Sequence, residues 1–500
     1  MPRPNVLLLM ADQLAAQWLP AYGHDVVRAP HLDRLASEAV VFESAYCASP
    51  LCAPSRAALL TGRLPSRTGV YDNATELPAS VPTVVHHLRA AGYATCLAGK
   101  MHFVGPDQLH GFERRLTPDI YPADLGWTPD WRVPLTERLP WYHSMESVED
   151  PGVCAASMQM DYDDEVAARA VRELFDLARS EDRPFFLTVS FTHPHDPWEL
   201  RPEYWERYDP DAIDPPAVGP LPRAEADPHS IRLRDMSGID AARLGADQVR
   251  RARHAYYAAI SYLDDRIGEV LRALRESGLE DDTVVLFTAD HGELLGERGL
   301  WYKMAFFDPA ARVPLLAWAP RRFAPARVAQ PVSLLDVAPT LLELAGLEPV
   351  QSLDGRSLAP ALAGAPLDEA DVVAEYLAEG VNAPAVMLRR GPRKYVACPG
   401  DPEQLYDLRQ DPHELANLAP SGCEDLREEV RRRWDLEGLR DAVLRSQDER
   451  RLVARALATG RRHRWDRVPS ADGAVVEGGD DLYAVQRARR LESTRGPRAG

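Results

Sequence analysis

Short apolar runs alternate with amphipathic segments up to about residue 290. The apolar runs predict buried strands over residues 5–10, 94–98, 185–192 and 283–288, of which 185–192 is rich in aromatic and β-branched residues. Apolar positions at helical spacing predict helices over residues 30–40, 54–62, 81–91, 164–179 and 247–277. Strands that alternate with helices in this way are typical of an α/β fold, in which a mostly parallel sheet is covered by helices on both faces.

The pattern changes after about residue 370. Short strands separated by Gly, Pro and Asp turns are predicted over residues 385–389, 394–398 and 404–408, as in a small antiparallel sheet, and charged helices follow over 424–459. We therefore expect a main domain over residues 1–370, a smaller C-terminal α+β domain over 371–460 and a tail over 461–500. Residues 202–234, rich in prolines and acids, predict a long loop.

Polar residues with chemical potential follow each of the four early strands. In strand order they are Asp12 and Gln13, Lys100 and His102, His193 and His195, and Asp290 and His291. Open α/β sheets bind ligands outside the carboxyl ends of their strands. Such residues after one strand would indicate an ordinary loop, but after four strands they predict a single cleft.

Composition and charge narrow the class of protein. A chain that is 45% hydrophobic and 27% charged is typical of a soluble globular protein. The net charge of −18 argues against a nucleic-acid or anionic-membrane partner, although a few local cations can still bind an anionic substrate. The apolar run over residues 6–10 is too short for a secretory signal or a membrane span, and the six cysteines lack close pairing, so we expect reduced thiols and a cytoplasmic location.

The segment around Cys52 points to the chemistry. Cys52 stands at the start of a helix initiated by Pro54, where unpaired backbone N–H groups and the helix dipole form an anion site, and Arg56 lies one turn further on. The sequence C-A-P-S-R followed by T-G-R, from Cys52 to Arg63, resembles the signature of type I sulfatases. The resemblance implies an alkaline-phosphatase-like fold and hydrolysis of a sulfate ester. It also implies that a formylglycine-generating enzyme oxidises Cys52 to formylglycine, whose hydrate is the nucleophile.

The resemblance extends to a metal site. By comparison with the family, Asp12, Gln13, Asp290 and His291 are expected to hold one divalent metal together with residue 52. Many sulfatases have Asp where this chain has Gln13, which leaves Gln13 as a neutral amide ligand or as no ligand. Oxygen-rich ligation favours Ca²⁺, with Mg²⁺ or Mn²⁺ as alternatives, over zinc.

Three further elements match the family's cationic residues. Lys100-Met101-His102 resembles its G-K-x-H element, His193-Pro194-His195 its P-H element, and Lys303 the lysine that follows the Asp-His pair. With Arg56, these residues would supply the positive charge that a sulfate needs. The resemblance implies that His195, together with Lys303, protonates the departing alkoxide and that His102 deprotonates the second hydroxyl of the hydrate.

Residues 109–113, 119–130, 190–197 and 296–301 look like the choline-sulfatase branch of the family, which implies choline-O-sulfate as the substrate. By the same resemblance Asn73, Trp127 and His143 should line the pocket, with His193 beside the substrate. Aromatic faces and a carboxylate recognise quaternary ammonium groups, and either Glu375 or Glu379 is expected to be that carboxylate. The neighbouring aromatic residues Trp131 and Trp141 fit packing beneath a loop equally well.

Choline-sulfatases carry a C-terminal tail that closes the pocket across a subunit interface, and residues 475–483 match that tail poorly. A homo-oligomer, dimer or tetramer, is nevertheless expected. The rival enzymes on the same scaffold are a phosphonate monoester or phosphodiester hydrolase and an arylsulfatase. The rival of another class is an inactive protein that binds sulfated ligands, against which the intact signature argues because such a protein needs no oxidisable cysteine.

Overall fold

A computed structural model describes residues 3–121, 123–133, 142–180, 183–460 and 489–490. Its centre is an eight-stranded sheet with the order β12-β2-β11-β9-β1-β7-β4-β5. The strands are β1 (Asn5–Ala11), β2 (Val40–Phe42), β4 (Ala94–Gly99), β5 (Arg114–Arg115), β7 (Phe185–Ser190), β9 (Thr283–Ala289), β11 (Leu315–Trp318) and β12 (Ala326–Val328). The four early strands predicted from the sequence are neighbours in its middle and run parallel.

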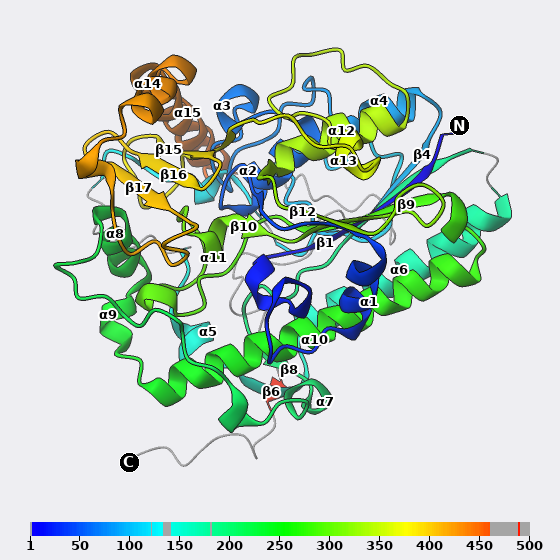
Figure 1. Ribbon diagram of the computed structural model, residues 1–500, viewed down its shortest axis with the longest axis horizontal. Helices are drawn as coiled ribbons and strands as arrows, with labels where there is room; N and C mark the ends of the chain where they lie inside the picture. The colour runs from blue at the N-terminus through cyan, green and yellow to red at the C-terminus, as the bar shows by residue number, and fades with distance from the viewer. Residues whose placement is uncertain (1–2, 122, 134–141, 181–182, 461–488, 491–500) are drawn as a thin grey trace.

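Helices cover both faces of this sheet, which confirms the predicted α/β class (Figure 1). On one side lie α1 (Pro30–Glu38), α6 (Met158–Ser180) and α10 (Ala246–Glu276), and on the other α2 (Cys52–Thr61), α4 (Val84–Ala90) and α12 (Val337–Leu344). The predicted helix over 30–40 ends at Glu38, because the apolar residues from Val40 form β2 instead. The sheet is not wholly parallel, since β11 runs antiparallel to both of its neighbours.

A smaller antiparallel sheet is built from the C-terminal part of the chain. It contains β14 (Val372–Tyr376), β15 (Ala385–Arg390), β16 (Arg393–Ala397) and β17 (Gln404–Asp407), followed by α14 (Glu424–Arg433) and α15 (Leu436–Leu457). The fully buried Lys394 of β16 joins this sheet to the main domain, donating to Asp308 (2.7 Å) and to the Phe306 carbonyl (2.7 Å) and pairing with Glu414.

Residues 202–234 are a long loop only in their middle. Residues 206–227 contain no helix or strand apart from the 3-10 turn Pro210–Ala212, as the prolines suggested. The two ends are helical, in α7 (Pro202–Trp205) and the start of α8 (Pro228–Ser237), whose first turn is capped by the Asp227 carboxylate at 3.0 Å from the Ser230 N–H. Pro202 and Pro228 each occupy the first turn of a helix, where the missing N–H costs nothing.

The other short elements are as follows: β3 (Ala45–Tyr46), β6 (Gly152–Ala156), β8 (Glu199–Leu200), β10 (Arg312–Val313), β13 (Val332–Ser333), α3 (Pro65–Thr68), α5 (Glu146–Glu149), α9 (Ile239–Ala242), α11 (Asp308–Ala311) and α13 (Ala359–Leu362). The predicted tail lies outside the described residues except for β18 (Arg489–Arg490), which pairs with β6. None of the six cysteines forms a disulfide in the described structure. Among the described helices, none has the length and apolarity needed to cross a membrane.

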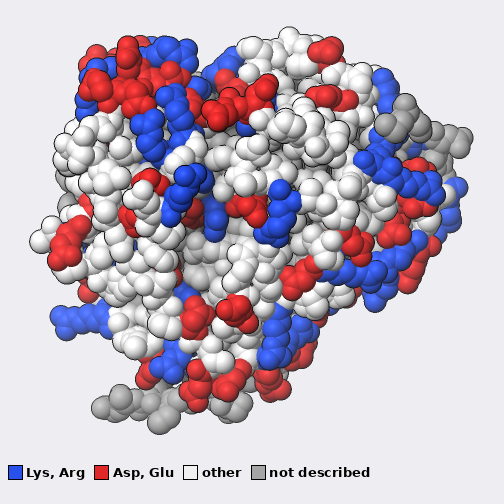
Figure 2. Space-filling model, in the orientation of Figure 1, with Lys and Arg blue, Asp and Glu red and all other residues white. Residues whose placement is uncertain are grey.

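Charged side chains of both signs are interspersed over the face shown in Figure 2. They are densest around α14, where Arg432 and Arg433 both pair with Glu429. On this face the acidic balance of the chain is thus spread out, and no broad basic surface is visible.

Candidate active site

Cys52 is the first residue of α2, and only 2% of it is exposed. The preceding residue, Leu51, is extended and offers no side-chain cap to the helix. The Asn73 side chain takes part of that role, because its oxygen accepts the N–H of Ala53 at 3.0 Å. Asn73 therefore lies at the start of α2 beside residue 52, and its oxygen is already hydrogen-bonded within the protein, so its place in a substrate pocket stays a prediction.

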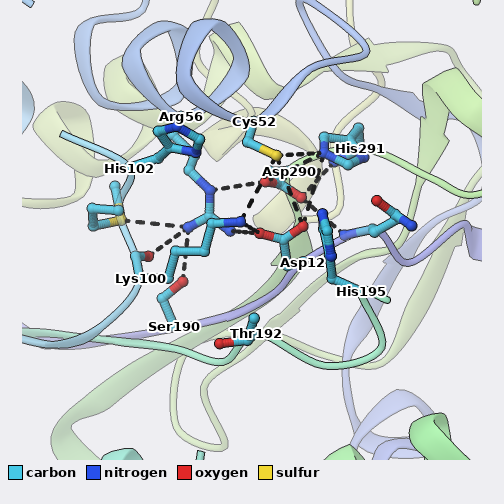
Figure 3. Close-up of polar contacts among 12 residues, drawn as sticks. Asp12, Cys52, Arg56, Lys100, His102, Ser190, Thr192, His195, Asp290 and His291 are labelled. Carbon is cyan, nitrogen blue, oxygen red and sulfur yellow. Dashed lines mark hydrogen bonds and ion pairs between the residues drawn. The ribbon is translucent and has the colours of Figure 1, made fainter. Parts of the chain in front are cut away.

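Four residues from three elements bring their ligating atoms together beside the helix start (Figure 3). Asp12 follows β1, Asp290 and His291 follow β9, and these three with Cys52 place one ligating atom each within 4.8 Å of one another. His291 Nδ1 lies 3.1 Å from the Gly292 carbonyl, to which it can only donate, so Nε2 keeps its lone pair and lies 3.1 Å from the Cys52 sulfur. This buried set of carboxylates, imidazole and residue 52 fits a divalent cation.

Arg56 does not project freely toward an anion. Its guanidinium is fully buried and donates to Asp290 at 2.8 Å, to Asp12 at 2.9 Å, to the Lys100 carbonyl at 2.6 Å and to the Ser190 hydroxyl at 2.9 Å. Its planar fork thus braces two of the predicted metal ligands and fixes their separation. The predicted direct contact of Arg56 with sulfate is replaced by this bracing role.

Lys100 forms an ion pair with Asp12, and its ammonium lies 3.8 Å from the Cys52 sulfur. Burial alone would raise the pKa of the Cys52 thiol, but Lys100, Lys303 and His291 hold that pKa well below its usual value. The same burial opposes ionisation of Asp12, yet the nearby cations keep its pKa lowered. The site is therefore a positive environment for whatever negative charge residue 52 carries.

His102 is a predicted site residue whose imidazole makes no hydrogen bond within the described part of the chain. Its backbone is left-handed (φ 57°), and Asp119 holds it there by accepting the N–H groups of Met101 and His102, both at 3.0 Å. Both ring nitrogens are buried without a hydrogen-bond partner in the described part of the chain. The Trp127 ring stands edge-on to His102, with 6.4 Å between ring centroids. The imidazole is thus available to a bound ligand or water.

His195 and Lys303 form a pair, with Nε2 and Nζ 2.8 Å apart. His195 Nδ1 lies 2.6 Å from the Asp196 carbonyl, so Nδ1 carries the proton and Nε2 accepts from the lysine. Lys303 also donates to the Gln13 side-chain oxygen. A lysine has three N–H donors, so one remains for a ligand.

Gln13 is turned toward this pair. Its amide NH₂ donates to Glu293 at 2.6 Å and to Asp196 at 3.2 Å. Glu293 also accepts the N–H groups of Leu295 (2.8 Å) and Tyr302 (2.6 Å), and so fixes both Gln13 and the backbone just before Lys303. No role was predicted for Glu293, although it lies two residues after His291 in the same motif. The Gln13 oxygen already accepts a hydrogen bond from the Lys303 ammonium. Metal ligation by Gln13 stays a prediction.

The two remaining predicted histidines are His193 and His143. His193 Nδ1 is 2.7 Å from Asp163, and the residue is only 1% exposed, so this contact anchors the loop that carries His195. His143 stacks on the Tyr302 ring with centroids 4.4 Å apart and lies 3.7 Å from Asp196. Burial lowers the pKa of His143 to about 4, which makes it a neutral, flat surface.

The two predicted acids differ sharply. Glu375 accepts the Ser66 N–H (2.7 Å), the Ser66 hydroxyl (2.6 Å) and the Trp434 indole N–H (2.6 Å), so both of its oxygens are committed to the protein. Glu379 is buried, and its Oε2 has no hydrogen-bond partner among the described residues. Burial raises the pKa of Glu379 to about 7, which Asp72 also favours and Lys303 opposes. Only Glu379 remains open to a ligand.

Trp131 is a packing residue, 3% exposed, whose indole donates to the Ala378 carbonyl at 2.7 Å. Tyr142 is buried with its hydroxyl 3.3 Å from the Met304 sulfur. Trp141 lies outside the described residues.

Comparison with known proteins defines the class. The Sulfatase family model matches residues 4–347, and a model described as N-sulphoglucosamine sulphohydrolase, C-terminal, matches residues 296–437. The chain therefore belongs to the sulfatase family and is a sulfuric ester hydrolase. Among curated proteins it is 49% identical over 486 residues to choline-sulfatase from Rhizobium meliloti (strain 1021), covering 93% of this chain and 94% of that protein.

More distant relatives mark the range of chemistries on this fold. An arylsulfatase of Clostridium perfringens (strain 13 / Type A) is 28% identical over 441 residues, which cover 84% of this chain and 91% of the relative. The crystal structure of the phosphonate monoester hydrolase of Agrobacterium radiobacter superposes with a TM-score of 0.68 at 27% identity and covers 91% of this chain and 96% of that chain. These likenesses confirm the alkaline-phosphatase-like fold.

Proposed function

We propose that this sulfatase hydrolyses choline-O-sulfate to choline and sulfate. The observation that carries the proposal is the buried Glu379 carboxylate, whose Oε2 has no hydrogen-bond partner among the described residues. A buried carboxylate whose oxygen has no partner is costly unless the positive charge of a ligand compensates it. A quaternary ammonium has no N–H to donate and is recognised by negative charge and aromatic faces, which Glu379 and the Trp127 ring beside His102 can supply. The extensive identity with choline-sulfatase supports the same substrate.

The residues at the helix start fit a metal and a modified residue 52. Asp12, Asp290 and His291 would hold a divalent cation, for which Ca²⁺ is our first choice. When bound, the cation supplies Lewis acidity that stabilises negative charge on the sulfate oxygens. Formylglycine at position 52, once hydrated, supplies a hydroxyl nucleophile in place of the thiol. Arg56 and Lys100 neutralise the Asp12 and Asp290 carboxylates, so that the SO₃ group meets a net positive site.

The chain's own residues handle the protons. The choline alkoxide is a poor leaving group and needs a proton as the S–O bond breaks. Because His195 Nε2 accepts from Lys303, the proton nearest to the leaving oxygen is on the lysine, and His195 is placed to share it. His102, with both nitrogens unpartnered, is the base on the other side of the site. This assignment shifts the acid role from His195 toward Lys303.

The test is kcat/KM for choline-O-sulfate, p-nitrophenyl sulfate and phenyl phosphonate monoesters. We expect choline-O-sulfate to be the best of the three, and a preference for either competitor would assign the enzyme to that rival chemistry. Glu379→Gln should weaken choline-O-sulfate selectively, by about tenfold, the scale of a cation–carboxylate contact in a desolvated pocket. Glu375→Gln is the matched control, because that carboxylate holds Ser66 and Trp434 instead of facing the ligand.

The formylglycine proposal is tested separately by intact mass. The peptide that contains residue 52 should be about 18 Da lighter than its cysteine form after maturation by a formylglycine-generating enzyme. Cys52→Ala should be inactive with every sulfate ester. Full activity of that variant would contradict the proposed nucleophile.

Two further proposals concern the cell and the assembly. A reducing, cytoplasmic compartment is supported by the six cysteines, none of which forms a disulfide in the described structure. A homo-oligomer, dimer or tetramer, is proposed from the likeness to choline-sulfatase, and light scattering of the purified protein tests it. A monomer at micromolar concentration would overturn that proposal.

A further inference from the structure

The C-terminal helix α15 grips the segment that carries Trp127. Gln447 accepts the Trp131 N–H at 3.0 Å, and Arg451 pairs with Asp130. The α15 helix also contacts the short helical turn Leu125–Trp127 directly. A helix from the small domain thus shapes one wall of the active site of the main domain.

Arg450 is the buried centre of this contact. It is 9% exposed and makes a bidentate pair with the fully buried Asp72, at 2.7 and 2.8 Å, while the same guanidinium donates to the Thr128 hydroxyl at 3.2 Å. Fork-to-fork pairs of this kind fix both distance and angle. Arg450 therefore sets the spacing between the segment of Asp72 and the segment of Thr128.

Each partner of Arg450 adjoins a residue of the proposed pocket. Asp72 precedes Asn73, whose oxygen holds the N–H of Ala53 next to residue 52. Thr128 follows Trp127, whose ring stands against His102. One side chain from α15 thus spans the two segments that flank the reacting centre.

We propose that Arg450 is a positioning residue that selects the alcohol portion of the ester. By holding Asn73 and Trp127 at a fixed separation, it sets the width of the pocket for a compact trimethylammonium-sized group as against a flat aromatic ring. This inference rests on the proposed choline-O-sulfate activity. It assigns the shape of the pocket to Arg450 and leaves the recognition of charge to Glu379.

The test measures kcat and KM for three esters: choline-O-sulfate, its uncharged isostere 3,3-dimethylbutyl sulfate, and p-nitrophenyl sulfate. Arg450→Lys keeps the charge but cannot form the bidentate fork, and Arg450→Met removes both. We expect KM for both compact esters to rise about tenfold with kcat little changed, and the aryl ester to be affected far less. Glu379→Gln should weaken only the charged ester.

Arg132→Met is the matched control, because Arg132 makes an equally bidentate pair from the same loop to the same helix, with Asp448, but at the surface (49% and 57% exposed side chains). It should leave the ratio of compact to aryl esters unchanged. Equal losses for all three esters in both Arg450 variants, or no change at all, would overturn the positioning role. Wild-type enzyme that ignores choline-O-sulfate would refute the proposed substrate, while the isostere-to-aryl ratio would still decide the role of Arg450.

Discussion

Replacing Glu293 by glutamine tests how Lys303, the proposed proton donor, is held. The Glu293 carboxylate accepts three N–H donors, two from the backbone of Leu295 and Tyr302 and one from the Gln13 amide. A glutamine has one oxygen and one NH₂ group at the same place, so at least one of these donors must face another donor. Gln13 then loses its anchor, and with it Lys303 loses a fixed acceptor.

The size of the effect follows from the cost of one buried unsatisfied donor, about 1–3 kcal/mol. If that cost is expressed in the transition state, kcat/KM falls roughly 5- to 150-fold, since each factor of ten corresponds to about 1.36 kcal/mol. The loss should be larger for choline-O-sulfate than for p-nitrophenyl sulfate, because the better leaving group depends less on protonation by Lys303. Burial raises the pKa of Glu293 to about 7, so the assay is run at pH 8 to sample the charged form of the wild type.

Glu297→Gln is the matched control. Glu297 lies in the same loop, is 5% exposed and accepts two backbone N–H groups, from Ala217 and Val218 at 2.9 Å each. It should cost similar stability in urea unfolding while leaving the leaving-group dependence of kcat/KM intact. Wild-type activity of Glu293→Gln on both esters, or equal losses in the two variants, would refute the reasoning that Glu293 positions Lys303.

Three other outcomes are expected. The KM for choline-O-sulfate should rise as the pH falls below about 7, because burial raises the pKa of Glu379 to about 7 and only its charged form attracts a cation; an identical profile in Glu379→Gln would speak against this contact. Re-adding the divalent ion after chelation should raise the melting temperature of the protein. The expected gain in the free energy of unfolding is about 2.7 kcal/mol at a hundredfold excess of the ion over its Kd. Asp12→Asn should abolish that shift, and a shift that persists would place the ion elsewhere. Lys394→Met should lower the free energy of unfolding by about 3–5 kcal/mol, because it leaves the Asp308 and Glu414 carboxylates uncompensated in a buried cluster, and urea unfolding with unchanged stability would show that the cluster is neutral in sum.

The sequence was sufficient to predict the central parallel strands and the polar residues that follow them. The central strands are continuous apolar runs, each followed by a pair of polar residues. These polar residues could therefore be predicted as site residues before the order of the strands in the sheet was known. Short strands such as β2 and β11 were not predicted, because a run of only three or four apolar residues does not distinguish a strand from part of a helix. The antiparallel direction of β11 depends on pairing with β9, which no local pattern records.

Within the site, residue types were predictable but their partners were not. The structure brings Asp12, Asp290 and His291 beside Cys52 as the motifs indicate. Arg56 was expected to supply positive charge to the sulfate, yet its guanidinium donates to the Asp290 and Asp12 carboxylates. These contacts depend on two strands that are far apart in the chain, so no local pattern predicts them. The same holds for Glu375, whose partner Trp434 arrives from the C-terminal part.

The burial of residue 52 limits when the proposed oxidation of Cys52 can take place. In the folded molecule Cys52 is 2% exposed and lies 3.1 Å from His291, which is synthesised 239 residues later. At roughly 5–20 residues per second, a ribosome leaves about 10–50 s between the emergence of the two. Under the proposed maturation, a modifying enzyme therefore reaches the signature during this interval, before β9 pairs with β1. Expression in a host without such an enzyme is then expected to give folded protein that keeps a cysteine at position 52.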